Sequence, residues 1–344
     1  MGIWRSIAAR FSLDDFRDSY TVDVLREPQS YSGKLEAEAG AQLRVATMEY
    51  WLQLTETLPE QIGVWQFDGK TARQINVMDF SGLNVIQLGE RGSILQAFKK
   101  ERPASRFHQL KLSPGEYYPH MARPTSEDPK DSPGRNPDPH PDQRERANSA
   151  GQMVALIEQL EAICRVVHPE GVNMRVFGQG IRNVLILACT EVEAHCRRIL
   201  SANGNEGTNM TEYARLAGAM RLGEYSVSFP YYPWLKPIRP FNNWKLGRRL
   251  GWYSAYNGVK HNREKELSRG TLQQAFQAVA GCFVLLCAEK GWDFALKGKA
   301  ANRAFLKLIG VPNWHPSELY VIPYQTEWHR IEHPLVTEKR VRQR

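Results

Sequence analysis

The chain has 344 residues, 42% hydrophobic and 24% charged, so it is long enough for two domains that each bury a core. The net charge of +8 is uneven, since residues 1–147 carry 19 Lys and Arg against 21 Asp and Glu, and residues 148–344 carry 26 against 16. The basic second half favours a polyanionic partner such as RNA or DNA, and the alternative is a basic surface without any partner. No apolar run has the length that spans a bilayer, so we expect no membrane association.

The cysteines and histidines indicate which cellular compartment and which metal sites to expect. The five cysteines are odd in number, form no C-x-x-C pair and lie in apolar stretches. This usage predicts core thiols in a reducing compartment, the cytoplasm, without a disulfide framework or a zinc site. His329 and His333 match an H-x-x-E-H pattern, but Pro334 follows at once and breaks the helix that such a zinc site needs. We therefore expect neither a metal nor a cofactor.

Residues 1–121 mix strand and helix patterns and predict a small β-rich α+β domain of unassigned role. Strand patterns occur at residues 20–25, 63–67, 71–77 and 83–88, and Asp68-Gly69 is a hairpin turn signal between the second and the third. Periodicity leaves helix and strand open for residues 46–57.

A Pro-rich segment separates the two halves. Residues 124–147 contain six prolines and many charges but no aromatic or large aliphatic residue. Such a composition cannot bury surface, so we expect residues 122–148 to be a disordered linker.

The chain turns helical after this linker, and we expect residues 149–311 to form a mainly α-helical bundle. Helices are predicted over residues 149–167, 181–200, 211–220, 244–264 and 272–290, the last being the most apolar and therefore central. In the second of these, an inward apolar stripe is opposed by an outer face with Arg182, Glu193, His195 and Arg198. Residues 312–344 are expected to be an extended basic tail.

The richest motif is the helical stretch Trp252–Arg263. At 3.6 residues per turn Asn257 and His261 share one face, while Tyr256 and Arg263 lie on a neighbouring one, with Lys260 beside the histidine. RNA cleavage without a metal needs an acid or base that titrates near neutral pH and a cation over the scissile phosphate. His261 can fill the first role and Lys260 or Arg263 the second. The alternative is a solvent-facing helix end, where basic residues are favoured by the helix dipole.

A second polar cluster occurs on the predicted helix 181–200. Glu191, Glu193, His195 and Arg198 recur at helical spacing, and surface ion pairing is the favoured interpretation.

Three features follow one another over roughly residues 180–290: the pattern from Arg182 through Glu193, the motif Tyr256-Asn257-x-x-Lys260-His261-x-Arg263, and an apolar helix. Together they resemble HEPN-like helical proteins. The resemblance implies a helical bundle that dimerises, and many such domains are metal-independent ribonucleases, toxins or phage-defence effectors. Asn257 and His261 match the polar residue and the histidine of the family signature, whereas Tyr256 stands where that signature has arginine. The resemblance thereby assigns catalysis to His261, Asn257, Lys260 and Arg263, and binding to Arg182, Glu193, Arg198 and Tyr256.

The sequence therefore predicts a cytoplasmic, homodimeric RNA-binding protein with an α+β N-terminal domain and a HEPN-like bundle. Its predicted activity is metal-independent RNA cleavage. The alternative is a non-catalytic helical module for interaction or dimerisation, with a regulatory or structural role.

Overall fold

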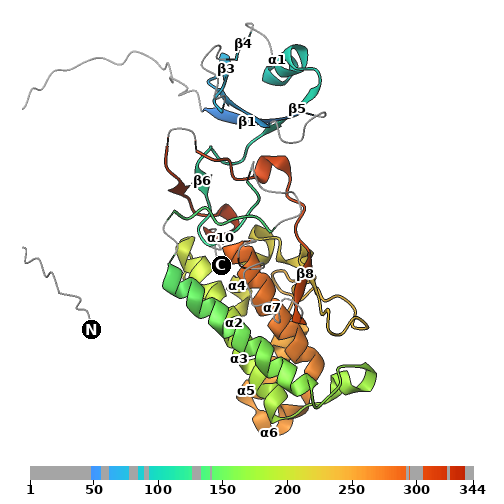
Figure 1. Cartoon of the computed structure of the whole chain (residues 1–344). Coiled ribbons are helices and arrows are strands. Elements are labelled where there is room, and N and C mark those ends of the chain that lie inside the picture. Colours follow the sequence, from blue (N-terminus) through green and yellow to red (C-terminus); the bar gives the residue numbers. More distant parts are fainter. Residues whose placement is uncertain are drawn as a thin grey trace, which may run out of the picture. The chain divides into compact units, whose positions relative to one another are not determined.

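The computed structural model describes residues 48–55, 62–76, 84–88, 93–125, 133–139, 142–291, 294, 305–323 and 326–337, which all belong to one compact unit, Ala46–Arg344. Within it a small antiparallel sheet precedes a set of helices in the chain (Figure 1). This confirms the prediction of an α+β region followed by a helical one. The strand expected at residues 20–25 and the basic residues after 337 lie outside the described residues.

The sheet has the strand order β4-β3-β2-β1-β5, and every neighbouring pair is antiparallel. Its strands are β1 (Glu49–Thr55), β2 (Ile62–Phe67), β3 (Thr71–Gln74), β4 (Val85–Gln87) and β5 (Ser105–Gln109). Helix α1 (Ile94–Glu101) buries Phe98 against Trp51 and Trp65, with ring centroids 5.9 and 5.4 Å apart. Residues 46–57, left open by the sequence, therefore contain a strand, because their aromatic side chains pack in a sheet core.

Strands β2 and β3 form the hairpin that the Asp68-Gly69 pair predicts. Gly69 has a φ of 93°, a left-handed conformation that glycine adopts at little cost. The Asp68 carboxylate accepts hydrogen bonds from the backbone N–H groups of Lys70 and Thr71, at 2.9 and 2.7 Å. The turn is thus closed by its own residues.

The helical part is built around α7, which is buried along most of its length. The longer helices are α2 (Gln143–Cys164), α3 (Gln179–Ala202), α4 (Met210–Ala219), α5 (Gly251–His261) and α7 (Leu272–Lys290). Helices α2, α3 and α5 each pack against α7 (Figure 1). The inward stripe predicted for α3 is confirmed, since its members are buried: Ile181, Leu185, Ala188, Val192, Cys196 and Ile199. The central position of the most apolar helix is confirmed as well.

Contrary to our interpretation of the sequence, helix α7 is long and apolar enough to cross a membrane by length and composition alone. However, 83% of its apolar window is buried inside the protein, which is typical of the core helix of a soluble bundle. All five cysteines are buried and free, as their apolar surroundings predicted.

The described parts of the expected linker are structured. Helix α2 begins at Gln143, before the expected start at 149, because the Asp142 side chain accepts the Glu145 N–H at 3.0 Å and caps the helix. Upstream, the backbone of Arg135 forms isolated antiparallel β-bridges with Arg123 and with Gly291. A disordered linker is therefore the wrong description of residues 122–125, 133–139 and 142–148, whereas residues 126–132, 140 and 141 lie outside the described part.

The expected extended tail also packs onto the rest of the protein wherever it is described. Strand β9 (His329–Arg330) pairs in parallel with β6 (Glu116–Tyr117), and the short helix α10 (Pro334–Thr337) buries Val336. A further strand pair joins β7 (Ser226–Ser228) to β8 (Lys307–Gly310). His329 lies in a strand and not in a helix, which agrees with our rejection of the H-x-x-E-H pattern as a zinc site.

Helix α5 is shorter at both ends than the expected 244–264. It starts at Gly251, and it ends at His261 because Asn262 adopts φ −139° and ψ 65°, outside the helical region. A separate short helix, α6 (Arg263–Glu266), follows. Arg263 therefore does not continue the face of α5 on which the sequence placed it.

Candidate nucleic-acid interface

Helix α5 buries its aromatic stripe and exposes its C-terminal polar residues. Trp252, Tyr256 and Val259 are buried, and the Trp252 indole N–H donates to the Pro240 carbonyl at 2.9 Å. Lys260 and His261 are exposed at the end of the helix. Two of the four predicted catalytic residues, Lys260 and His261, thus lie at the surface, on a helix that is anchored by its other face.

The ammonium group of Lys260 is held by Tyr256, the residue one helical turn before it. Its Nζ donates to the phenol oxygen at 2.7 Å and lies 4.9 Å from the ring centroid. This hydrogen bond raises the pKa of Lys260 above its ordinary value and outweighs the opposing effect of desolvation. Lys260 is therefore a fixed positive charge beside His261.

Arg182, from the first turn of α3, reaches the end of α5. Its Nε lies 3.5 Å from the Val259 carbonyl oxygen, so the N-terminal end of α3 is beside the C-terminal end of α5. Since Arg263 opens α6 directly after this end (Figure 1), four predicted residues gather here. We call Arg182, Lys260, His261 and Arg263 the basic end.

Glu193 belongs to the middle of the α3–α5 contact and not to the basic end. Its carboxylate accepts a hydrogen bond from the Tyr253 hydroxyl at 2.6 Å. Burial, followed by this hydrogen bond, raises the pKa of Tyr253 well above its ordinary value, so the phenol stays protonated. Glu193 is eleven positions after Arg182 on α3, which corresponds to about 16 Å along the helix.

Arg198 lies further still from the basic end, in a buried ion cluster. Its guanidinium contacts Glu145 of α2 at 3.0 Å and Glu289 of α7 at 3.3 Å. Arg198 is sixteen positions after Arg182, which corresponds to about 24 Å of helix. The eight residues singled out in the sequence therefore do not form one site.

Glu289 is the centre of this ion cluster and is fully buried. Its carboxylate contacts His120 Nδ1 at 2.9 Å, His195 Nδ1 at 2.6 Å and Lys290 Nζ at 2.8 Å. Burial alone would raise the pKa of Glu289, but the hydrogen bonds of both histidines and the positive charges outweigh it and hold the pKa well below its ordinary value. His195 was expected on the outer face of α3, but its side chain is buried because it binds the buried Glu289 carboxylate.

Three groups of the ion cluster could approach a metal ion. In the described part of the chain, the possible ligand atoms of His120, Glu145 and Glu289 lie within 4.8 Å of one another. However, Lys290 Nζ contacts both carboxylates and Arg198 contacts them as well. The two acidic charges are thus already balanced by two basic ones, and we assign the cluster a structural role.

The strongest charge feature of the protein was missed by our motif-based interpretation, although it is visible in the sequence. Residues 225–263 contain seven Lys and Arg and no Asp or Glu, and all seven cations are exposed: Lys236, Arg239, Lys245, Arg248, Arg249, Lys260 and Arg263. We call residues 225–263 the acid-free segment. Among the described residues, the side chains of the first five form neither an ion pair nor a hydrogen bond. Unpaired cations of this kind are the electrostatic footprint of a polyanion-binding surface.

A cavity of about 650 Å³ borders this segment at Trp244 and Lys245. Arg215 and Arg221 of the neighbouring α4 region also line it, with Glu224 as the acidic residue. Both arginines are ion-paired, Arg215 with Glu212 at 2.9 Å and Arg221 with Glu224 at 2.6 Å, so they add no unpaired positive charge to this surface.

No protein-family model, no curated protein and no solved structure matches this chain. The HEPN-like assignment accordingly stays a prediction.

The basic end has the groups that act on a phosphodiester. An exposed imidazole can transfer protons near neutral pH, and the neighbouring cations can stabilise charge on a phosphate. Asn257, half-buried one turn before His261, can contribute a polar side chain.

Proposed function

We propose that the protein binds RNA through the acid-free segment and the basic end, and that His261 is the acid–base group of a metal-independent cleavage reaction. The observation that carries this proposal is the run of exposed, unpaired cations that leads along the chain to His261. Such cations bind phosphates and release counterions. A role as a toxin or phage-defence effector, and a homodimer, would follow from the resemblance.

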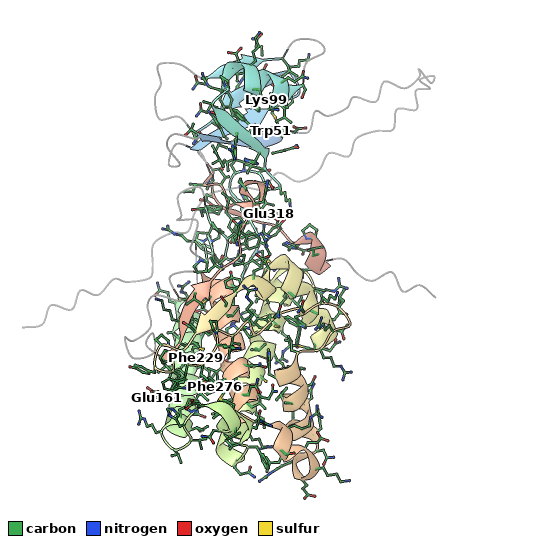
Figure 2. The ribbon with its side chains drawn as sticks, turned by 90° about the vertical axis from the view of Figure 1, so that its right-hand side faces the viewer. Trp51, Lys99, Glu161, Phe229, Phe276 and Glu318 are labelled. Carbon is green, nitrogen blue, oxygen red and sulfur yellow. The ribbon has the colours of Figure 1, made fainter. Side chains whose placement is uncertain are left out.

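RNA binding is tested by fluorescence anisotropy with a labelled RNA and the full-length protein at several salt concentrations. Replacing Arg248 and Arg249 together by Ala should weaken binding and lower the slope of log affinity against log salt by about 1.4, because each phosphate contact on a single strand contributes about 0.7. The matched control replaces Lys99, which Figure 2 labels, and its neighbour Lys100. Both are exposed on α1, and their replacement should leave both quantities unchanged. Equal losses in both double variants, or no RNA binding by the wild type, would contradict the proposal.

Cleavage is tested on bulk RNA with a metal chelator present. His261→Ala should slow cleavage by about a hundredfold or more, since acid–base groups contribute about 10²–10⁴ in rate. The melting temperature should stay unchanged because His261 is exposed. His329→Ala, which alters an exposed histidine of β9 outside the proposed RNA-binding surface, is the control. Binding without any cleavage by the wild type would favour the non-catalytic alternative.

A further inference from the structure

The aromatic–proline segment at residues 229–240 runs from the core of the bundle to its surface. Phe229 is buried against Phe276 of α7, with ring centroids 4.9 Å apart (Figure 2). Tyr232 contacts Phe276 at 6.4 Å on one side and Trp234 at 5.7 Å on the other. The exposed end of this aromatic series is therefore anchored to the central helix.

Trp234 is exposed and yet held in place. Its indole N–H donates to the Pro169 carbonyl at 3.0 Å, and the His168 ring lies 4.9 Å away at an interplanar angle of 30°. Nevertheless, 46% of Trp234 and 49% of the nearby Tyr231 are exposed. Prolines on both sides restrict the backbone, so little conformational entropy is lost when a partner binds these rings.

Charge decides which partner fits this surface. Lys236 and Arg239 follow Trp234 in the chain, are exposed and form no ion pair or side-chain hydrogen bond within the described ranges. Of two acidic side chains described near this segment, Glu161 is paired with Arg165 at 2.9 Å, whereas Glu170 lies 3.8 Å from His168, which balances a carboxylate only when protonated. Exposed aromatic rings beside free cations match the alternating bases and phosphates of a nucleic acid strand.

We propose that Trp234 and Tyr231 form a stacking platform for unpaired RNA bases, with Lys236 and Arg239 binding the flanking phosphates. This inference rests on the proposed RNA binding and adds to it a second contact surface and a preference for single strands. A duplex cannot use the platform because its bases are already stacked within the helix.

The test compares a labelled 20-nucleotide oligouridine with an RNA duplex of equal length, both with the full-length protein. Trp234→Ala should weaken binding of the single strand about tenfold, the size expected from the loss of one stacked base. Trp234→Phe should retain most of the affinity because it keeps a ring. Binding of the duplex should stay unchanged in both variants.

Leu95→Ala, which shortens an exposed apolar side chain of α1, is the control and should bind both RNAs like the wild type. If the wild type binds RNA but Trp234→Ala binds the single strand equally well, the platform is wrong and the proposed function stands. If the wild type binds neither RNA, the proposed function itself fails. A change from dimer to monomer in Trp234→Ala, measured by light scattering, would assign the surface to protein contacts and overturn the platform.

Discussion

His333 shows how one side chain can tie stability to pH. It is 7% exposed, its Nε2 lies 3.2 Å from the Arg123 guanidinium, and its ring packs on Tyr118. Burial, followed by the charge of Arg123, lowers the pKa of His333 from 6.5 to about 4. The folded protein therefore holds this imidazole neutral over a pH range in which the unfolded chain binds a proton.

We predict that this residue makes the protein less stable in mild acid. Between pH 6.5 and about 4 the unfolded state binds more protons at His333, so stability is complete above pH 6.5 and falls as the pH falls toward 4. The difference between the two pKa values corresponds to about 3 kcal/mol. Urea unfolding at several pH values should show that His333→Gln lacks this loss, whereas His329→Gln, at an exposed position, keeps it. Parallel pH profiles for the wild type and His333→Gln would contradict the assignment.

The ion cluster around Glu289 connects helices that are distant in the chain. It joins Glu145 of α2 and His195 of α3 to Glu289 near the end of α7, and it includes His120 from the segment before α2. Desolvation of buried charges is costly, and their mutual attraction repays it only when every partner is present. The cluster is thus better understood as selecting one arrangement of the helices than as adding net stability.

Removal of the central carboxylate should therefore be strongly destabilising. Glu289→Ala removes the carboxylate that binds His120 and His195 and leaves Lys290 and Arg198 to share Glu145 alone, and we expect a loss of about 3–5 kcal/mol in the free energy of unfolding. Glu266→Ala breaks an ion pair with Arg269 at the surface and should cost under about 1 kcal/mol. Chemical denaturation monitored by circular dichroism measures both, and similar losses for the two variants would show that the cluster has no special role.

At the scale of the molecule, segments from both sides of the helical region contribute to its core. Tyr117, Tyr118 and Met121 belong to the main hydrophobic cluster, and the Ala122 N–H donates to the Ala288 carbonyl of α7 at 2.8 Å. Asn203, after α3, donates its side-chain N–H to the Pro119 carbonyl at 3.0 Å. The residues just before 122 are thus structural parts of the bundle, while the sheet has its own core around Trp65.

A fragment starting at residue 122 should therefore be less stable than one starting at residue 110. The shorter fragment lacks β6, the pairing partner of β9, and four side chains of the main core, Leu112, Tyr117, Tyr118 and Met121. We expect a clearly lower melting temperature for residues 122–344 than for residues 110–344, measured by near-ultraviolet circular dichroism. Equal melting temperatures would mean that residues 110–121 are only docked on a core that is complete without them.

The sequence by itself determined the elements whose cause is local. The apolar pattern of residues 272–290 predicted α7, the apolar stripe predicted α3, and Asp68-Gly69 predicted the hairpin. In each case the deciding interactions join residues a few positions apart: hydrogen bonds within a helix, a cap, or a turn conformation that glycine accepts. The basic character of the acid-free segment was equally present in the sequence.

Only the tertiary structure decided which polar residues are buried and which meet. Spacing on α3 could not reveal that His195 and Arg198 point to Glu289, because their partner is about ninety residues away along the chain. It also could not separate Arg198 from the basic end, or show that residues after 312 pack against the bundle. Burial of a charged group depends on partners that arrive from other elements, and local periodicity contains no information about them.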